Sequence, residues 1–239
     1  MAFFKSSAAV DNAATSNNGD FVKIKQGASV RVRQLPPTTA DLKTIYRQVV
    51  HFKLKDPNKD GDKNGMVIGC NHEYNNGECL VCKVGKLFSN SKDKAEKDLT
   101  QYPSSILAKT SYATQVIVTE DGGKTYGAPC LLNLAPSGAE AIADANSTLE
   151  NNGLPTLNDF EKGQDIIISN PPTAGKYTLM QTSVQVPLDK ICPDAETTAI
   201  QDVAAELQPK LISADEQEEA LRFTFPNLDW DSIMKEVRG

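Results

Sequence analysis

Three cysteines lie close together in the sequence, at Cys70, Cys79 and Cys82, and His51 precedes them. Two cysteines separated by two residues can direct both thiolates from one tight turn toward a single metal ion. A third cysteine and one histidine complete the tetrahedral ligand set of a structural zinc site. Such a set leaves no coordination position open for water or substrate, which a catalytic zinc needs. The pattern therefore predicts one structural Zn²⁺.

The Cys79 and Cys82 pair is also compatible with other roles. A CxxC sequence is the redox motif of thioredoxin-like proteins, two cysteines can form a disulfide, and a free cysteine can serve as a small buried hydrophobic residue. A redox pair normally opens a helix after a strand in a βαβ unit. This pair instead follows a polar loop of Asn, Gly and Glu and has two further potential ligands nearby. We therefore interpret the cysteines as metal ligands.

The chain has two histidines, His51 and His72, and either one can supply the fourth ligand. His72 is separated from Cys70 by one residue, a spacing that strains simultaneous ligation, although Cys-x-His pairs do occur. His51 follows an apolar stretch at residues 45–50, and a strand there would hold its ring in a fixed place. The residues favour His51 and leave His72 as the alternative.

The composition is that of a folded protein from a reducing compartment. At 239 residues and 39% hydrophobic content, the chain is long enough for a sizeable core. No apolar run approaches the roughly 18 residues of a membrane span, and the N-terminus lacks the core of a signal peptide. Five cysteines, three of them expected as ligands, argue against a secreted disulfide framework and leave Cys130 and Cys192 as packing residues. We expect a soluble, intracellular protein with no membrane partner.

The two halves of the chain carry opposite charge. Residues 1–130 contain 18 Lys and Arg against 13 Asp and Glu, whereas residues 131–239 contain 7 against 18, and these balances give the net charge of −6. A cationic region followed by an acidic one is typical of a protein that binds an anionic polymer with one part of its chain. A solvated acidic helix face would explain the second half equally well.

The pattern of apolar residues predicts mainly β structure with minor α content. Apolar and basic residues alternate at period two in residues 21–25 and 30–35, and Gln26-Gly27 between them predicts a hairpin turn. Further strands are expected at residues 44–54, 105–119, 165–169 and 176–181, with a hairpin turn at 120–123 and helices at 84–99 and 137–150. Several short strands joined by such turns predict a small barrel.

Composition divides the chain into three regions. Residues 1–20 are rich in Ser, Ala and Asn and predict a flexible N-terminal arm. Residues 21–191 contain the strands of the barrel and, at about 51–100, an inserted zinc-binding subdomain. Residues 192–239 change to Ala, Glu, Gln and Leu, with 11 acidic residues against 4 basic ones, and predict an acidic, helical and loosely packed C-terminal region.

Aromatic residues in the cationic half indicate a single-stranded nucleic acid as the partner. Basic residues neutralise the phosphates of such a strand, and unpaired bases stack on aromatic rings, each stacked base contributing about 1–3 kcal/mol. The candidate rings are Tyr46, Tyr74, Phe88, Tyr102, Tyr112 and Tyr126, and the basic residues chosen on charge alone are Arg31, Arg33, Lys53 and Lys55. Core packing is the alternative for each ring. Tyr74, inside the polar cysteine loop, is the ring that we expect to be exposed.

The order of these motifs resembles that of the single-stranded DNA-binding proteins of T-even-type tailed phages. The matching residues, within a similarity over roughly residues 20–190, are Val49-Val50-His51, Cys70, Glu78-Cys79-Leu80-Val81-Cys82-Lys83 and Lys109-Thr110-Ser111-Tyr112. The resemblance implies an OB-fold barrel with an inserted zinc subdomain and the zinc ligands His51, Cys70, Cys79 and Cys82. It also implies DNA contacts at Tyr74, Phe88, Tyr102, Lys109 and Tyr112.

The resemblance further implies a function: to coat and protect unpaired DNA, without sequence preference, during phage DNA replication, recombination and repair in the host cytoplasm. We expect the N-terminal arm to mediate self-association along DNA. We expect the acidic C-terminal region either to compete with DNA for the binding groove or to recruit replication and recombination proteins. The alternative is a zinc-ribbon protein-interaction module that binds no nucleic acid. The sequence contains no paired-carboxylate metal motif, phosphate-binding glycine loop or nucleophile–base set, so we expect no enzymatic activity.

Overall fold

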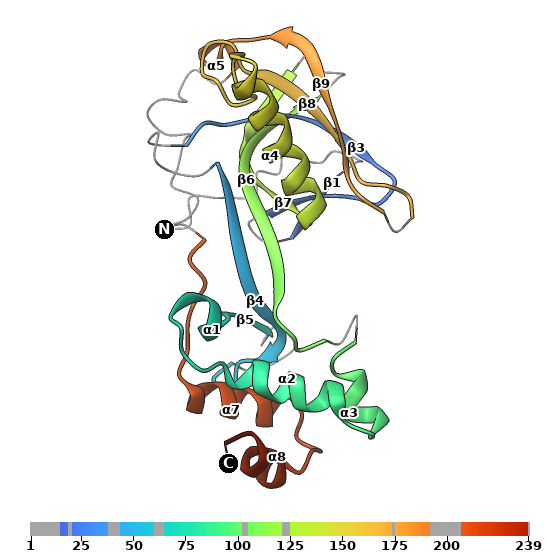
Figure 1. The fold of residues 1–239 in the computed structure, drawn as a ribbon, viewed down its shortest axis with the longest axis vertical. Helices are drawn as coiled ribbons and strands as arrows, with labels where there is room; N and C mark the ends of the chain where they lie inside the picture. The colour runs from blue at the N-terminus through green and yellow to red at the C-terminus, as the bar shows by residue number, and fades with distance from the viewer. Residues whose placement is uncertain are drawn as a thin grey trace. The chain divides into compact units, whose positions relative to one another are not determined.

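The computed structural model describes residues 15–18, 21–37, 44–59, 65–101, 105–120, 125–173, 175–191 and 207–238 (Figure 1). The fold divides into two compact units. The first, here named the sheet unit, takes its residues from Met1–Arg47 and Ser111–Leu207, and the second, named the cysteine unit, from Gln48–Thr110 and Gln208–Gly239. Each unit therefore combines segments that are distant in the sequence.

The sheet unit is built on a mixed β-sheet. Its strands are β1 (Thr15–Asn18), β2 (Phe21–Ile24), β3 (Ser29–Gln34), β6 (Lys109–Glu120), β7 (Thr125–Leu134), β8 (Gln164–Ser169) and β9 (Thr178–Gln185). They follow the order β1-β2-β7-β6-β3-β8-β9, in which β2 and β7 are parallel and all other neighbouring strands are antiparallel. This path ends at β1 and at β9, so the described strands do not close into a barrel.

The strands predicted at residues 21–25 and 30–35 are present as β2 and β3, but the hairpin predicted between them is wrong. β2 pairs with β1 and β7, whereas β3 pairs with β6 and β8. A turn does form, because Gly27 adopts a φ of +76°, which glycine tolerates without steric cost. The Gly27 N–H donates to the carbonyl of Asn170 at 2.9 Å, so the turn is bound to the segment after β8.

Alternating apolar residues form the core of the sheet unit. Val32 of β3 is paired with Ile166 of β8, and both side chains are fully buried. Helix α4 (Pro136–Asn151) begins with a proline, which suits the first helical turn, and buries Ile142 in the same cluster. The short helix α5 (Leu188–Ile191) follows β9. Apolar residues that recur every second position in the strands and every 3.6 positions in helix α4 are thus buried in the same core.

The cysteine unit joins an antiparallel strand pair to several helices. Its elements are β4 (Ile45–Lys55, from Gln48 on), β5 (Gly65–Gly69), α1 (Asn71–Tyr74), α2 (Leu80–Asn90), α3 (Lys94–Asp98), α7 (Ala214–Thr224) and α8 (Trp230–Arg238). Helix α2 packs against α3, α7 and α8. The single helix predicted at residues 84–99 is therefore two helices. Asp93 separates them, because its side chain caps α3 by accepting a hydrogen bond from the Ala95 N–H at 2.7 Å.

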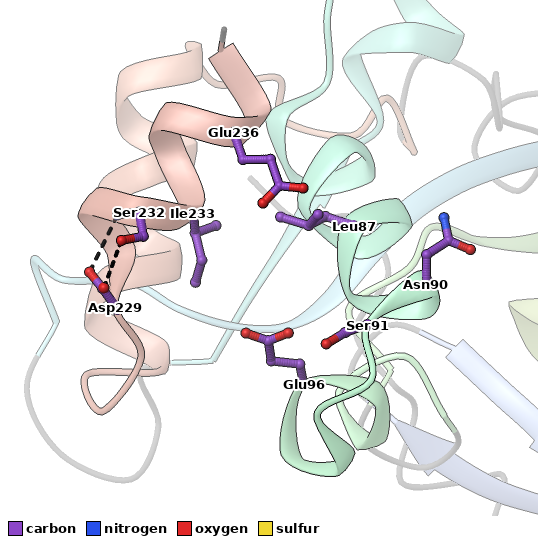
Figure 2. A pocket seen from close by; sticks show the side chains of 8 residues that line it. All are labelled: Leu87, Asn90, Ser91, Glu96, Asp229, Ser232, Ile233 and Glu236. Atoms are coloured by element: carbon purple, nitrogen blue, oxygen red, sulfur yellow. Dashed lines mark hydrogen bonds between the residues drawn. The ribbon is translucent and has the colours of Figure 1, made fainter.

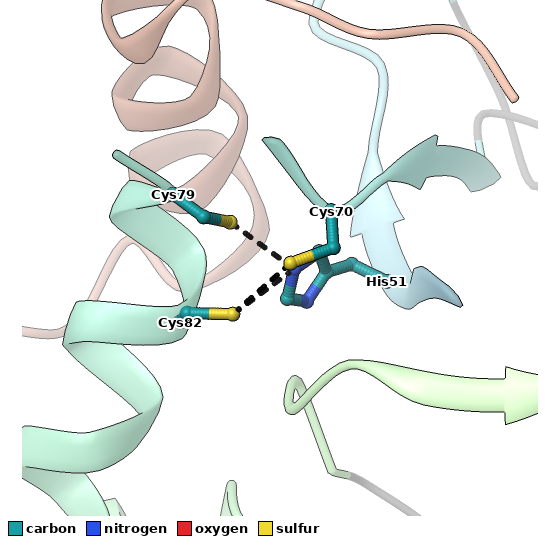
Figure 3. Close-up of side chains that lie close together, drawn as sticks. All are labelled: His51, Cys70, Cys79 and Cys82. Carbon is teal, nitrogen blue, oxygen red and sulfur yellow. Dashed lines mark hydrogen bonds between the residues drawn. The ribbon is translucent and has the colours of Figure 1, made fainter. Parts of the chain in front are cut away.

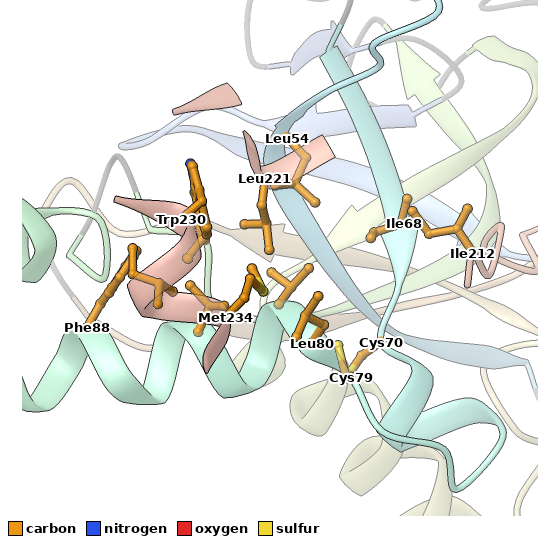
Figure 4. Packing of buried hydrophobic residues seen from close by; sticks show 14 of the residues in the cluster. Leu54, Ile68, Cys70, Cys79, Leu80, Phe88, Ile212, Leu221, Trp230 and Met234 are labelled. Carbon is orange, nitrogen blue, oxygen red and sulfur yellow. The ribbon is translucent and has the colours of Figure 1, made fainter. Parts of the chain in front are cut away.

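The C-terminal helices belong to the core of the cysteine unit (Figure 4). Leu221 of α7 and Trp230 and Met234 of α8 are at most 6% exposed. The Trp230 ring lies 6.4 Å from the ring of Phe88 in α2. The prediction of a loosely packed tail is thus wrong for residues 207–238. The acidic composition of this segment hid a narrow apolar stripe that faces inward.

At the coarse level, the predicted β-rich fold with a smaller helical part is confirmed by the mixed sheet and its helices. The boundaries of the two units differ from those of the predicted domains. Residues 208–239, expected as a separate C-terminal region, belong to the same unit as residues 48–110. The predicted N-terminal arm falls largely outside the described residues. Among the helices that the structure describes, none is long and apolar enough to cross a membrane.

Candidate metal centre

Four side chains from successive elements converge in the cysteine unit (Figure 3). His51 is carried by β4, Cys70 directly follows β5, Cys79 is the N-cap of α2, and Cys82 lies in the first turn of that helix. The pairing of β4 with β5 sets His51 opposite Ile68, which brings Cys70 close to the histidine. The four ligand atoms all lie within 4.8 Å of one another.

The spacing of these atoms suits one tetrahedral zinc ion. Nε2 of His51 lies 3.2 Å from Sγ of Cys79 and 3.6 Å from Sγ of Cys82, and the sulfurs of Cys70 and Cys82 are 3.5 Å apart. Zn–S bonds of about 2.3 Å and Zn–N bonds of about 2.0 Å place tetrahedral ligand atoms about 3.5–3.8 Å from one another. The three cysteines are free thiols. The donor set and its spacing therefore fit a single ion.

Burial makes this a closed site. His51 is fully buried, Cys70 and Cys79 are each 3% exposed, and Cys82 is half-buried. Nδ1 of His51 lies 2.9 Å from the carbonyl oxygen of Ile106. A carbonyl only accepts, so Nδ1 carries the proton and Nε2 directs its lone pair toward the cysteines. His72, the alternative ligand, is exposed on α1 and is not part of the cluster.

The thiols cannot all ionise without a cation among them. Hydrogen bonding from Cys82 is the main cause that lowers the pKa of Cys79 to about 3. The Cys79 sulfur, aided by burial, raises the pKa of Cys82 far above its ordinary value, and burial is the main cause that raises the pKa of Cys70. One thiolate therefore forms readily, while the other two thiols hold their protons. A divalent cation would reverse that preference, because a coordinated thiol loses its proton.

Two of the predicted DNA contacts lie in protein interiors. Phe88 is fully buried in the core of the cysteine unit, so its ring has no free face for a base. Arg33 is 1% exposed and its Nε donates to Asp165 at 3.0 Å. This ion pair is buried, so a DNA phosphate cannot reach the Arg33 guanidinium. Both predictions of nucleic-acid contact are corrected by this burial. Periodicity alone does not tell a basic face on the surface from a charge paired inside the sheet.

Tyr74 and Arg31 are each bound within the protein. The Tyr74 ring packs partly buried against the core of the cysteine unit, and its hydroxyl accepts a hydrogen bond from the Val49 N–H at 2.8 Å. The expectation that Tyr74 is exposed is thus wrong, because the cysteine loop folds back onto β4. Arg31 pairs with the buried Asp165 at 2.8 Å and keeps 23% of its side chain exposed.

The remaining predicted contacts differ in accessibility. Lys53 and Lys55 of β4 are exposed, and Lys109 and Tyr112 of β6 are half-buried. Tyr46 is half-buried against a small cluster of the sheet unit, and Tyr126 lies in β7. Tyr102 lies outside the described residues. In the described part of this candidate set, Lys53 and Lys55 are therefore the exposed positive charges, and Lys109 and Arg31 are partly exposed.

A pocket of about 480 Å³ opens beside α2 in the cysteine unit (Figure 2). Its lining residues are Leu87, Asn90, Ser91, Glu96, Asp229, Ser232, Ile233 and Glu236. Hydrogen bonds from Ser232, first from its hydroxyl and then from its N–H, lower the pKa of Asp229 and keep that carboxylate ionised. Three acidic side chains repel phosphate groups, so this pocket is unsuited to a nucleic-acid backbone.

No protein-family model matches the chain, and the search of curated proteins found no match either. The features that bear on function are therefore the cluster of four ligands and the accessible surface of each unit.

Proposed function

We propose that the chain binds single-stranded DNA without sequence preference and that a zinc ion held by His51, Cys70, Cys79 and Cys82 stabilises the cysteine unit. The observation that supports this proposal is the convergence of those four side chains in one buried cluster. They are the same four residues on which the resemblance to the phage single-stranded DNA-binding proteins depends. A chance spacing of cysteines gives no reason for convergence with a distant histidine, whereas a ligand set requires it.

Zinc in this site would contribute folding free energy and no reactivity, because three thiolates and one imidazole fill its coordination positions. His51 would bind through Nε2, with Ile106 fixing the ring through Nδ1. Cys79 and Cys82 would bind from the start of α2, and Cys70 from the end of β5. The ion would thus hold a strand pair and a helix together at one point.

In this proposal, DNA binding combines the attraction between basic side chains and phosphates with the stacking of bases on aromatic rings. In the cysteine unit, the exposed Lys53 and Lys55 and the half-buried Lys109 neutralise phosphates. In the sheet unit, Arg31 supplies partly exposed positive charge. Tyr112, half-buried on β6, offers a ring for an unpaired base. We extend the proposal to an OB-type arrangement of the strands, to self-association through residues 1–20, and to a role in phage replication, recombination and repair in the host cytoplasm, with recruitment of the enzymes concerned. No catalytic step is proposed.

A second candidate function is a zinc-stabilised module that docks another protein and binds no nucleic acid. The pocket beside α2 favours it, because its acidic residues Glu96 and Glu236 surround the apolar Leu87 and Ile233. The burial of Phe88 and Arg33 also removes two of the groups that DNA binding would use. The two functions differ in their response to salt and to single-stranded DNA.

A titration separates the two functions. The purified chain is added to a fluorescent oligo-dT and to a matched duplex at low and moderate salt, with zinc content determined on the same sample. We expect tighter binding to the single strand, an affinity that falls as salt rises, and one zinc per chain. Lys55→Ala should weaken binding and reduce the salt slope by about one, whereas Lys235→Ala on α8 serves as the matched exposed control.

Tyr112→Leu tests the stacking part, because leucine keeps an apolar group on β6 but has no aromatic face. We expect a loss of about 1–3 kcal/mol in binding to oligo-dT without a change in salt slope. Stoichiometric zinc without any affinity for the oligonucleotide would contradict the DNA-binding proposal and favour the docking module.

A further inference from the structure

The C-terminal segment touches the candidate metal centre at three places. The Gly69 N–H, immediately before Cys70, donates to the carbonyl of Lys210 at 2.9 Å. The side-chain amide of Asn71, immediately after Cys70, donates to the carbonyl of Ile212 at 2.9 Å. The third contact is made by Gln217 of α7. Residues 210–217 therefore bracket the ligand loop.

Gln217 is a fully buried amide in a helix that is otherwise rich in acidic residues. Its Oε1 accepts hydrogen bonds from the N–H groups of Leu80 at 2.9 Å and Val81 at 3.3 Å, and it lies 3.7 Å from Sγ of Cys79. Its Nε2 donates to the carbonyl of Ile212 at 3.2 Å. Both ends of the amide are thus satisfied, which a buried polar group requires.

The two N–H groups that donate hydrogen bonds to Gln217 belong to Leu80 and Val81, the residues between Cys79 and Cys82. They are also the first free donors of helix α2, whose N-cap residue Cys79 has no side-chain cap of its own. Gln217 therefore caps α2 from another helix. Because Leu80 and Val81 form the turn that directs both thiolates, a fixed orientation of their peptide groups fixes the separation of the two ligands.

We propose that Gln217 is a positioning residue of the metal centre: it holds the Cys79–Cys82 turn in the geometry that binds metal. Reciprocally, metal occupancy holds α7 and α8 in place, because coupling between two binding events acts equally in both directions. The inference rests on the proposed metal site and adds a residue 138 positions from Cys79. Residues that hold metal ligands in place through hydrogen bonds typically change metal affinity by about 10–100-fold when they are replaced.

The test compares three variants on the full chain. Gln217→Met keeps the length of the side chain but cannot accept a hydrogen bond, and Glu219→Met makes the same change in residue type at an exposed position of α7. Leu221→Ala weakens the packing of α7 at a buried position whose apolar side chain cannot hydrogen-bond to the cysteine turn. The dissociation constant for Zn²⁺ is measured by competition with a chromophoric chelator, at a temperature where every variant is folded.

We expect Gln217→Met to bind Zn²⁺ at least 10-fold more weakly than the unmodified chain, with Glu219→Met unchanged. Leu221→Ala should lower the melting temperature but weaken Zn²⁺ binding less than Gln217→Met does, because it leaves the hydrogen bonds from Leu80 and Val81 to Gln217 in place. With Co²⁺ as the probe, the thiolate-to-metal absorption should change in Gln217→Met and stay constant in the other two. Equal affinity and equal spectra in Gln217→Met and Glu219→Met would overturn the inference.

Hydrogen exchange on the unmodified chain gives an answer even where Gln217→Met does not fold. Metal removal should reduce the protection of residues 214–224 together with that of residues 80–90. Full protection of α7 after complete metal removal would overturn the reciprocal coupling. Failure of the unmodified chain to bind Zn²⁺ would instead overturn the metal site itself and the inference with it, so the two failures are distinguishable.

Discussion

The sheet unit and the cysteine unit bury their interiors in different ways. In the sheet unit, neighbouring strands supply paired apolar residues such as Val32 and Ile166, and the buried carboxylate of Asp165 is matched by arginines. In the cysteine unit, the apolar cluster itself includes Cys70 and Cys79, whose sulfurs face the candidate metal site. The core of the sheet unit is therefore held by hydrophobic packing and buried ion pairs, whereas the core of the cysteine unit also contains candidate metal ligands.

This difference indicates where each unit is vulnerable. A strand core loses stability in proportion to the apolar volume or charge pairing removed from it. A ligand cluster would lose its organising contact in one step when the ion leaves, because all four ligands would be held by that single ion.

Metal removal should produce the largest effect and should confine it to the cysteine unit. Structural zinc sites contribute folding free energy on the order of 10 kcal/mol in small domains. We expect a strong chelator, or Cys79→Ser, to abolish zinc binding and reduce hydrogen-exchange protection in residues 65–101 and 207–238. Strands β3 and β8 of the sheet unit should keep their protection. The same measurement on Cys130→Ser, a buried cysteine outside the cluster, provides the control.

Loss of protection throughout both units after chelation would contradict the proposed independence of their interiors. Unchanged zinc content in Cys79→Ser would contradict the ligand assignment.

Asp165→Ala, in contrast to metal removal, should strongly reduce the stability of the sheet unit and leave that of the cysteine unit unchanged. The substitution leaves the guanidinium of Arg33 buried without its carboxylate, and breaking a buried pair in this way costs about 3–5 kcal/mol. Denaturant unfolding of Asp165→Ala, compared with Asp144→Ala at an exposed position of α4, measures the cost. Metal affinity should be unchanged in both variants, and weaker zinc binding in Asp165→Ala would show that the units are coupled.

The smallest effect concerns the start of α7. Ser213 and Glu216 form a capping box, in which each side chain accepts a hydrogen bond from the backbone N–H of the other. We expect Ser213→Ala to reduce stability by about 1 kcal/mol in thermal denaturation at neutral pH. A decrease comparable to that of metal removal would mean that local capping, and not the ligand cluster, organises the cysteine unit.

This capping effect should depend on pH with a defined sign. The Ser213 N–H, as the main cause, lowers the pKa of Glu216 in the folded chain. A lowered folded-state pKa means that the ionised carboxylate stabilises the fold above the unfolded-state pKa and that this contribution is lost as pH falls through the folded-state pKa. The stability difference between Glu216→Gln and the unmodified chain should therefore shrink in acid.

Local patterns in the sequence predicted the features that depend on neighbouring residues. The CxxC spacing with Cys70 and His51 gave a ligand set that the structure brings together. Period-two alternation located β2 and β3, and apolar periodicity located α4. Each of these follows from residue type and spacing within one segment.

Features that depend on distant segments could not be predicted in this way. The pairing of β3 with β8 joins residues more than a hundred positions apart, and it places Asp165 against Arg33 where a basic surface was expected. The cap that Gln217 provides for α2 has no local signal at all, because the residue is an ordinary glutamine in an acidic helix. Burial of Phe88 likewise depends on α8, which the acidic composition concealed.

X-ray absorption at the zinc edge of the purified chain, with total zinc measured on the same sample, tests the ligand assignment most directly. The account predicts one zinc per chain with three sulfur ligands at about 2.3 Å and one nitrogen ligand at about 2.0–2.1 Å. Chelation of that zinc should then unfold the cysteine unit and leave the sheet unit intact. A purified chain that binds no zinc, or binds it through oxygen ligands, would contradict the account.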